Sequence, residues 1–204
     1  MEVVIASANR GKIGEVIEIL SGLPLTFITK DDVPSWPAVE ETGRTYVENA
    51  RLKARALVEA TGKAAIADDS GIEVDYLDGR PGVRSARLAG PGATDKQNNV
   101  RLISLLFGVP VERRSARYAC TALLLTPSGE EYSATGYCEG SIALEPKGAG
   151  GFGYDPWFVP AGESRTMAEL SAAEKHAISH RGKAFRALRE EIKGMLENSA
   201  GERT

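Results

Sequence analysis

Residues 3–20 read VVIASANRGKIGEVIEIL, and this stretch decides the class of fold that the sequence predicts. Its first four residues are apolar and suit a short buried strand. From Ile13 to Leu20 the apolar residues recur at the spacing of a helix. The polar residues 7–12 form the turn between them. A strand, a turn and a helix in this order are typical of an α/β protein.

Strands and helices continue to alternate after this unit, and strands then cluster in the second half of the chain. The expected strands cover residues 3–6, 25–28, 64–67, 116–126, 132–143 and 157–159. The expected helices cover residues 13–20, a segment that begins at Thr45, residues 100–106, a short segment opened by Ser171, and a C-terminal segment that Ser179 could cap. Residues 31–44 and 79–94 are expected to be loops. The pattern predicts an α/β protein with a mixed sheet.

The composition excludes several classes of function. The net charge of −3 over 204 residues offers no general basic surface for nucleic acid. The two cysteines, Cys120 and Cys138, lack the spacing of a zinc site. Neither a signal peptide nor a membrane span is visible, so we expect a cytosolic protein that binds no membrane. We expect one domain over residues 1–198 and a frayed tail over residues 199–204.

The first turn suits a phosphate group. Gly11 and Lys12 lie where the turn enters a helix, and a helix N-terminus favours an anion through its N–H groups and its dipole. Lys12 would add a positive charge and Asn9 a neutral donor. The segment lacks the Walker A pattern. Its alternative interpretation is an ordinary connection between a strand and a helix.

Two acidic pairs suit magnesium binding or general-base catalysis. Asp68 and Asp69 end the apolar run 64–67, and neighbours in a strand point to opposite faces, so we expect at most one of them in an active site. Glu40 and Glu41 lie in the loop before Thr45. The alternative is that each pair belongs to a solvated turn or loop.

A glycine-rich loop suits recognition of a base. Residues 148–153 match G-x-G-x-x-G, but a dinucleotide fingerprint must open a helix, and here an aromatic run with Pro156 follows. Phe152 and Tyr154 could stack on a base, and Asp155 could accept a hydrogen bond from its edge. The alternative is a tight turn with a core aromatic residue.

Residues 174–181, EKHAISHR, hold both histidines of the chain between two cationic side chains. Lys175 suits a phosphate, and Arg181 suits a phosphate or a carbonyl oxygen. The alternative is a solvated junction between helices.

These stretches, in this order, resemble the Ham1-type inosine triphosphate pyrophosphatases. The matching segments are residues 7–12 (SANRGK), 40–43 (EETG), 48–50 with 53–54, 67–71 (ADDSG), 81–82 with 85–87, 151–156 (GFGYDP), and 174–175 with 179–181. Each segment alone is weak, but seven in order over nearly the whole chain are specific. One mild departure is Ser7, where the family often has threonine, and a hydroxyl is kept.

The resemblance implies an elongated mixed sheet flanked by helices in two lobes, a central cleft, and a homodimer. It also implies a Mg²⁺-dependent enzyme that hydrolyses ITP, dITP and XTP to the monophosphate and pyrophosphate. Asp69 would be the general base and a metal ligand, together with Glu40 or Glu41. The residues implied to bind substrate are Ser7, Asn9, Lys12, Lys53, Ser70, Phe152, Gly153, Tyr154, Asp155, Lys175, His180 and Arg181.

Three other functions remain as alternatives. Maf-type pyrophosphatases act on pyrimidine or modified nucleotides and differ in substrate. A regulatory module could bind a nucleotide without catalysis, although a mere binder of a polyanion gains little from four carboxylates. A purely structural protein has no need of donors, acids and an aromatic glycine loop in one chain.

Overall fold

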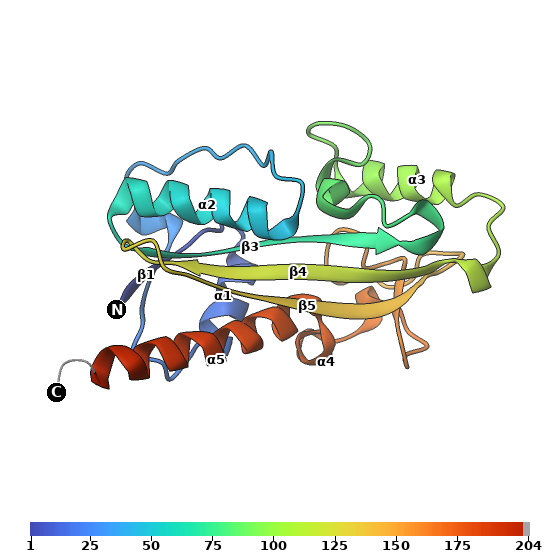
Figure 1. Cartoon of the computed structure of the whole chain (residues 1–204). Helices are drawn as coiled ribbons and strands as arrows, with labels where there is room; N and C mark the ends of the chain where they lie inside the picture. The colour runs from blue at the N-terminus through green and yellow to red at the C-terminus, as the bar shows by residue number, and fades with distance from the viewer. Residues whose placement is uncertain (202–204) are drawn as a thin grey trace. The chain divides into compact units, whose positions relative to one another are not determined.

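The computed structural model describes residues 1–201, which fold into two compact units (Figure 1). Unit 1 contains Met1–Asp69, Cys120–Gly136 and the chain from Arg181 onward. Unit 2 contains Ser70–Ala119 and Tyr137–His180. Two of the boundaries fall inside predicted site segments, so Asp69 and Ser70 belong to different units, as do His180 and Arg181.

Within residues 1–201 the strands form one six-stranded sheet in the order β2-β1-β3-β4-β5-β6. The strands are β1 (Glu2–Ile5), β2 (Thr26–Ile28), β3 (Ala64–Val74), β4 (Ser115–Leu125), β5 (Glu131–Ile142) and β6 (Phe158–Pro160). Strand β1 pairs in parallel with β2 and with β3, whereas β5 pairs antiparallel with β6. The predicted α/β class with a mixed sheet is therefore confirmed.

Helices α1 to α4 begin at capped residues, and two of these caps were predicted. The helices are α1 (Arg10–Ile19), α2 (Tyr46–Thr61), α3 (Asp95–Leu105), α4 (Ala172–Ile178) and α5 (His180–Gly201). The capping boxes at Thr45 and Ser171 open α2 and α4. Helix α3 begins before the predicted residue 100, because Thr94 and Gln97 form a further capping box. Helix α1 likewise begins before Ile13, because Asn9 caps it.

Short 3-10 helices occupy parts of the connections. They are Lys30–Asp32, Asp75–Leu77, Gly82–Arg87, Val111–Arg113 and Met167–Glu169. The segment Gly82–Arg87 lies inside the predicted loop 79–94, so that loop is more ordered than expected.

Helices cover both faces of the sheet in unit 1. Helix α2 packs on one face, and α1 and α5 pack on the other (Figure 1). Alternate residues of a strand pack into the two cores on opposite faces of the sheet. Val4 packs in one cluster with Ala54 and Leu57 of α2, and Ile5 packs in another with Phe185 of α5. The same alternation along β3 decides where its acidic residues point.

Strand β3 corrects one prediction. The apolar run was expected to end at Ala67, but the strand continues through the acidic residues to Val74. Both acids are buried there, and each has partners on its own face: Arg181 lies beside Asp68, and Asn49 and Lys53 lie beside Asp69. These partners compensate the cost of burying the two charges, and the strand can therefore continue past them.

Unit 2 has its own core, in which residues of β3, β4 and β5 meet α3 and the chain around β6. Tyr118 and Phe158 are in ring contact there, with centroids 4.6 Å apart. The buried Arg114 donates to the carbonyl oxygens of Leu106, Val109 and Ala143, and so satisfies groups at the C-terminal end of α3. This core supports the glycine-rich loop and helix α4.

The C-terminal prediction falls partly outside the described residues. Helix α5 continues to Gly201, and residues 202–204 of the predicted tail lie outside the part of the chain that is described. The single two-lobed domain over residues 1–198 stays a prediction. No helix within residues 1–201 is long and apolar enough to cross a membrane.

A close approach in unit 2 predicts the effect of one substitution. A Cβ at Gly71 would lie 2.2 Å from the carbonyl oxygen of Gly82 and 2.6 Å from Ser85 Oγ. Ser85 Oγ cannot move freely, because it donates to Gly82 O and accepts from the N–H of Ile72. We expect Gly71→Ala to lower the free energy of unfolding by about 1–3 kcal/mol in urea denaturation.

The matched control is Gly194→Ala on α5, where no heavy atom beyond the neighbouring residues and the nearby backbone of the helix itself lies within 4 Å of the new Cβ. This change should leave the free energy of unfolding equal or raise it by about 0.5–1 kcal/mol, because alanine favours a helix interior. Equal stability of the two variants would contradict the close-approach argument.

Candidate active site

The turn after β1 is shaped by its own polar side chains. Ser7 Oγ accepts from the N–H of Asn9 at 3.1 Å, and Asn9 Oδ1 accepts from the N–H of Lys12, also at 3.1 Å. Asn9 is therefore the N-cap of α1, a helix of ten residues. The first turn of α1 and the Lys12 side chain together present donors and positive charge, as an anionic group requires.

Asp69 lies in a group of side chains from α2 and the loop that precedes it. Its Oδ2 accepts from Asn49 Nδ2 at 2.9 Å, and its Oδ1 lies 3.7 Å from Lys53 Nζ. The same ammonium group donates to Glu41 Oε1 at 3.1 Å. Asn49 Oδ1 accepts from the N–H of Gly43 at 2.8 Å, which ties the loop to the helix. The structure thus brings Glu41, Lys53 and Asp69 together, while Glu40 is exposed.

Asp68 points to the opposite face of β3. Its Oδ2 accepts from Arg181 Nε at 3.3 Å and lies 3.9 Å from Cys120 Sγ. Arg181 NH1 also lies 4.0 Å from Glu15 Oε2. Burial opposes the charge of Asp68, but the positive charges of Lys12, Arg181 and Lys53 outweigh it and hold the pKa of this carboxyl well below its usual value.

The cations of this group also keep their charge. Burial tends to lower the pKa of Lys53, but Asp68, Asp69 and Glu41 raise it above the ordinary value. The pKa of Arg181 is likewise raised, because Asp68 and its other neighbours outweigh burial. Burial and the nearby Asp68 raise the pKa of Cys120, so this thiol is not a nucleophile. Unit 1 therefore holds a cluster of fixed charges of both signs.

The carboxylates of Glu41 and Asp69 fit a magnesium ion. Both approach one ammonium group, so their oxygen atoms lie near each other. Among residues 1–201, no group of three or more histidine, cysteine, aspartate or glutamate side chains is placed to hold a metal ion. Mg²⁺ is usually held by one or two carboxylates together with water and substrate phosphates, rather than by an all-protein cage. Two carboxylates match that requirement.

In unit 2, the glycine-rich loop packs closely on the segment Met167–Glu169. The N–H of Gly150 donates to the carbonyl oxygen of Ala168 at 3.0 Å. A Cβ at Gly148 would lie 2.5 Å from that backbone, and one at Gly151 would lie 2.1 Å from Asp155 Oδ2. The glycines are therefore required by close packing as well as by conformation, since Gly148 and Gly151 have φ of +76° and +73°.

Asp155 is occupied by donors of the protein itself. It is 3% exposed, and it accepts from the N–H of Phe152 at 2.8 Å and from Tyr118 OH at 3.3 Å. Lys175 Nζ forms an ion pair with the same carboxylate and lies 4.4 Å from the centroid of the Phe152 ring. Within this structure Asp155 holds the loop together, and its predicted contact with a base stays a prediction.

His180 and Phe152 present aromatic surfaces of different exposure. The His180 ring stacks on Tyr118 with centroids 4.7 Å apart and an interplanar angle of 10°. His180 is buried, whereas Phe152 is 47% exposed. Tyr154 is buried and donates through its hydroxyl to the carbonyl oxygen of Ser85 at 2.7 Å. Phe152 is thus the aromatic residue of the loop that is open to a base, and Ser70 at the start of unit 2 is half-buried.

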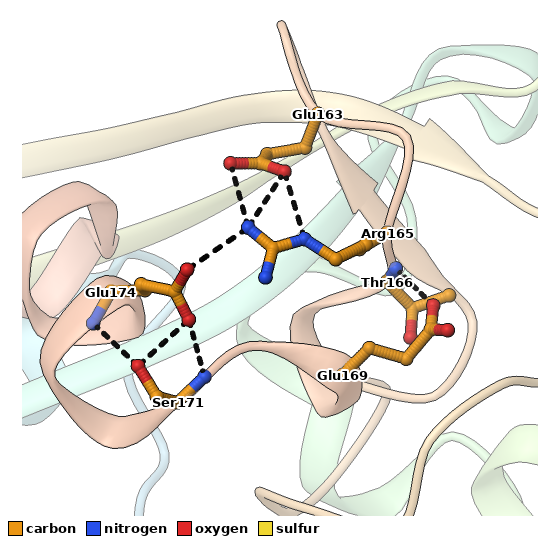
Figure 2. A network of polar contacts seen from close by, with 6 residues as sticks. All are labelled: Glu163, Arg165, Thr166, Glu169, Ser171 and Glu174. Atoms are coloured by element: carbon orange, nitrogen blue, oxygen red, sulfur yellow. Dashed lines mark hydrogen bonds and ion pairs between the residues drawn. The ribbon is translucent and has the colours of Figure 1, made fainter.

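Helix α4, which carries Lys175, is anchored by the network in Figure 2. Ser171 Oγ accepts from the N–H of Glu174, and Glu174 Oε2 accepts from the N–H of Ser171. Arg165 bridges Glu174 Oε1 and the carboxylate of Glu163. Hydrogen bonds from Ser171 lower the pKa of Glu174 to about 2. Lys175 is therefore held on a short helix whose N-terminus has several supports.

The structure adds residues that the sequence analysis did not assign to the site. Asn49 positions Asp69, Asp68 and Glu15 surround Arg181, and Tyr118 contacts both Asp155 and His180. Asn49 had a detectable signal, since it lies in one of the matching segments. Tyr118 had none, because in sequence it is one aromatic residue in an expected strand. Arg181 lies with Asp68 in unit 1, whereas the other residues predicted to contact the base, Phe152 to Asp155 and His180, belong to unit 2.

Comparisons with known proteins show to which family the chain is similar. A model of the Ham1 family matches residues 3–191. The dITP/XTP pyrophosphatase of Geobacter sulfurreducens is 47% identical over 189 residues, which cover 93% of this chain and 95% of that protein. The dITP/XTP pyrophosphatase of Streptomyces coelicolor is 49% identical over 195 residues, covering 95% of this chain and 98% of that protein.

The fold is also that of a solved structure with substantial sequence identity. A HAM1 protein from Coxiella burnetii has a TM-score of 0.88 and 41% identity, covering 95% of this chain and 99% of that one. Because the family model, the relatives and this structure all match over nearly the whole chain, the protein belongs to the Ham1 family.

Proposed function

We propose that the protein hydrolyses dITP, ITP and XTP to the nucleoside monophosphate and pyrophosphate. The observation that carries this proposal is the group at Asp69, where Glu41, Lys53 and Asn49 surround a buried carboxylate. A structural ion pair alone does not need two carboxylates on one lysine. The relatives named dITP/XTP pyrophosphatase support the same reaction and substrates.

The cations of the protein would neutralise the triphosphate. A triphosphate carries several negative charges, and attack by water requires that they be compensated. The N-terminus of α1 with Ser7, Asn9 and Lys12 offers donors and one positive charge, and Lys53 offers another. Lys175 of unit 2 is the further cation that the proposal assigns to substrate. Lys53 remains protonated. Its ammonium group can therefore exchange its hydrogen bond with Glu41 for one with a phosphate, without gaining or losing a proton.

The carboxylates have two roles in this proposal. Glu41 and Asp69 would hold Mg²⁺, which when bound compensates phosphate charge and lowers the pKa of a bound water. Asp69 would also take a proton from the attacking water. Asn49 keeps Asp69 in one orientation through its hydrogen bond to Oδ2, so that Oδ1 is the oxygen directed toward Lys53.

The loop at residues 152–155 would select the base. Hypoxanthine and xanthine carry an N1–H donor and a 6-oxo acceptor, whereas adenine carries an amino donor and a bare N1. Phe152 offers an exposed ring for stacking. The carbonyl oxygens of Phe152 and Gly153 each accept one hydrogen bond within the protein, and we propose that a second lone pair on one of them accepts from N1–H. We propose that His180 or Arg181 donates to the 6-oxo group. Adenine would leave such groups unpaired, a mismatch that can cost about 10⁴-fold in rate.

Assembly and location are further parts of the proposal. The homodimer and the cytosolic location stay predictions from the sequence and the family. Size-exclusion chromatography with light scattering tests the homodimer, and a monomeric mass at all concentrations would contradict it.

Pyrophosphate release from a panel of nucleotides tests the proposed function. With Mg²⁺, we expect strong release from dITP, ITP and XTP and at least about 100-fold less from ATP at equal concentration, because adenine lacks the N1–H donor and the 6-oxo acceptor. GTP, whose guanine shares that edge with hypoxanthine, and dTTP complete the panel. Preference for dTTP or UTP would favour a Maf-like pyrophosphatase. Tight binding of ITP without release would favour a non-catalytic module.

The position of attack has its own test. Products of one monophosphate and one pyrophosphate follow most simply from attack at the α-phosphorus. Hydrolysis of ITP in oxygen-18 water should therefore label inosine monophosphate, as measured by mass spectrometry. Label in pyrophosphate would contradict attack at this phosphorus.

Asp69→Asn tests the role of the carboxylate. The amide cannot accept a proton, so we expect kcat to fall by about 10²–10⁴-fold while ITP still binds. The side chain keeps an oxygen for the Asn49 hydrogen bond, so the variant should fold. The matched control is Asp78→Asn, because Asp78 is exposed and asparagine tolerates its positive φ of 54°. Turnover near that of the wild type in Asp69→Asn would remove Asp69 from the role of base.

A further inference from the structure

Two side chains of α3 hold the backbone of Gly153 from both sides. Asp95 Oδ2 accepts from the N–H of Gly153 at 2.7 Å, and Asn99 Nδ2 donates to its carbonyl oxygen at 2.9 Å. Asp95 and Asn99 are four residues apart, so they lie one above the other on the same face of the helix. The N–H and the carbonyl belong to the two peptide groups that flank Gly153 Cα, and α3 therefore orients both.

Packing alone does not orient these peptide groups. Gly153 has a φ of +62°, and apart from its two chain neighbours no residue has a heavy atom within 4 Å of the place where a Cβ would be. A glycine in this setting can rotate its flanking peptides at low cost. The other glycines of the loop differ, because Gly148, Gly150 and Gly151 lie close to backbone or to Asp155. The N–H of Asp155 also donates to the carbonyl oxygen of Phe152 at 3.3 Å, which belongs to the first of these two peptide groups. The two hydrogen bonds from α3 add to this turn hydrogen bond and are the side-chain restraints on the loop at Gly153.

The neighbouring residues show why this restraint concerns substrate. Gly153 lies between Phe152, whose ring is exposed beside Lys175, and Tyr154, whose hydroxyl is held by Ser85. Rotation of either peptide at Gly153 would move the Phe152 ring and redirect the loop carbonyl groups. Those are the groups that the proposed function assigns to the base.

Asn98 and Asn99 are neighbours on α3, but they differ in how many of their side-chain polar atoms have hydrogen-bond partners. Asn98 uses both polar atoms, since Oδ1 accepts from the N–H of Ala89 at 2.9 Å and Nδ2 donates to Ala86 O at 3.0 Å. Asn99 Oδ1 is buried and has no hydrogen-bond partner among the described residues. A buried acceptor without a partner costs about as much as one hydrogen bond contributes. Asn99 therefore adds little net stability while holding the Gly153 carbonyl.

We propose that Asp95 and Asn99 are positioning residues for recognition of the base, acting through the two peptide groups at Gly153. This inference rests on the proposed function of the loop. Helix α3 carries none of the residues predicted for the site. According to this inference, it nevertheless contributes to the KM for the substrate and to the discrimination between purine bases.

Kinetics of four variants test the inference. For dITP, Asn99→Ala and Asp95→Ala should each raise KM about tenfold, the effect of one lost hydrogen bond, with kcat changed less than about twofold. The ratio of kcat/KM for dITP to kcat/KM for dATP should decrease. Asp95→Asn keeps an acceptor for the Gly153 N–H and should restore a KM near that of the wild type. Val100→Ala is the control, since Val100 lies on the same helix with 64% exposure.

A second measurement, amide hydrogen exchange, reports on the restraint of the loop at Gly153 and does not depend on catalysis. In ¹⁵N-labelled full-length protein, exchange of the Gly153 amide hydrogen should be at least about tenfold faster in Asp95→Ala than in the wild type and Val100→Ala. The thermal midpoint of Asn99→Ala should stay within about 2 °C of the wild type, because a hydrogen bond and an unpartnered acceptor are removed together.

The outcomes separate the two proposals. Release of pyrophosphate from dITP by the wild type, with unchanged KM in both alanine variants, would overturn the inference and leave the proposed function standing. Unchanged exchange of the Gly153 amide in Asp95→Ala would also overturn it. Absence of release by the wild type would overturn the proposed function and, with it, the inference.

Discussion

Two adjacent carboxylates in the middle of β3 impose the constraint on which unit 1 depends. A charge buried in a sheet is costly unless a partner compensates it. Because neighbours in a strand face opposite ways, Asp68 and Asp69 need partners on both faces. Helix α5 supplies Arg181 on one face, and α2 supplies Asn49 and Lys53 on the other. The helices that build the two cores of unit 1 are therefore the same helices that place compensating partners beside both acids.

This arrangement also explains how the group at Asp69 can bind and act. Lys53 keeps its proton because its anionic neighbours outweigh burial, so it is a permanent cation beside Glu41 and Asp69. The positions of these side chains are fixed before substrate arrives, since Asn49 joins Asp69 to the loop that carries Glu41. Preorganised charges of this kind stabilise developing charge without reorganisation.

The glycine-rich loop of unit 2 follows a different principle. Its ends are held by close packing at Gly148 and by the donors around Asp155, whereas its centre at Gly153 is held by side chains of α3. A loop that must present backbone groups to a base needs small residues, and small residues provide few packing restraints. Hydrogen bonds from a helix supply the restraint instead.

The sequence by itself determined the α/β class, the capping boxes at Thr45 and Ser171, the segments that hold the candidate site residues, and the family. These features depend on local patterns: apolar spacing, side chains that cap their own helix, and motifs read along the chain. The end of β3 at Ala67 was wrong for a related reason. A local reading treats Asp68 as a breaker, because its partner Arg181 is more than a hundred residues away in the chain.

Only the tertiary structure decided which groups serve each acid and which loop each helix supports. It placed Glu41 beside Lys53 and left Glu40 exposed, although the two are adjacent residues of the same type in the sequence. It enclosed Asp155 among Phe152, Tyr118 and Lys175, and it brought Asp95 and Asn99 to Gly153. The physical reason is that charge compensation and hydrogen bonding act over a few ångströms in space, between residues whose separation along the chain carries no signal of their contact.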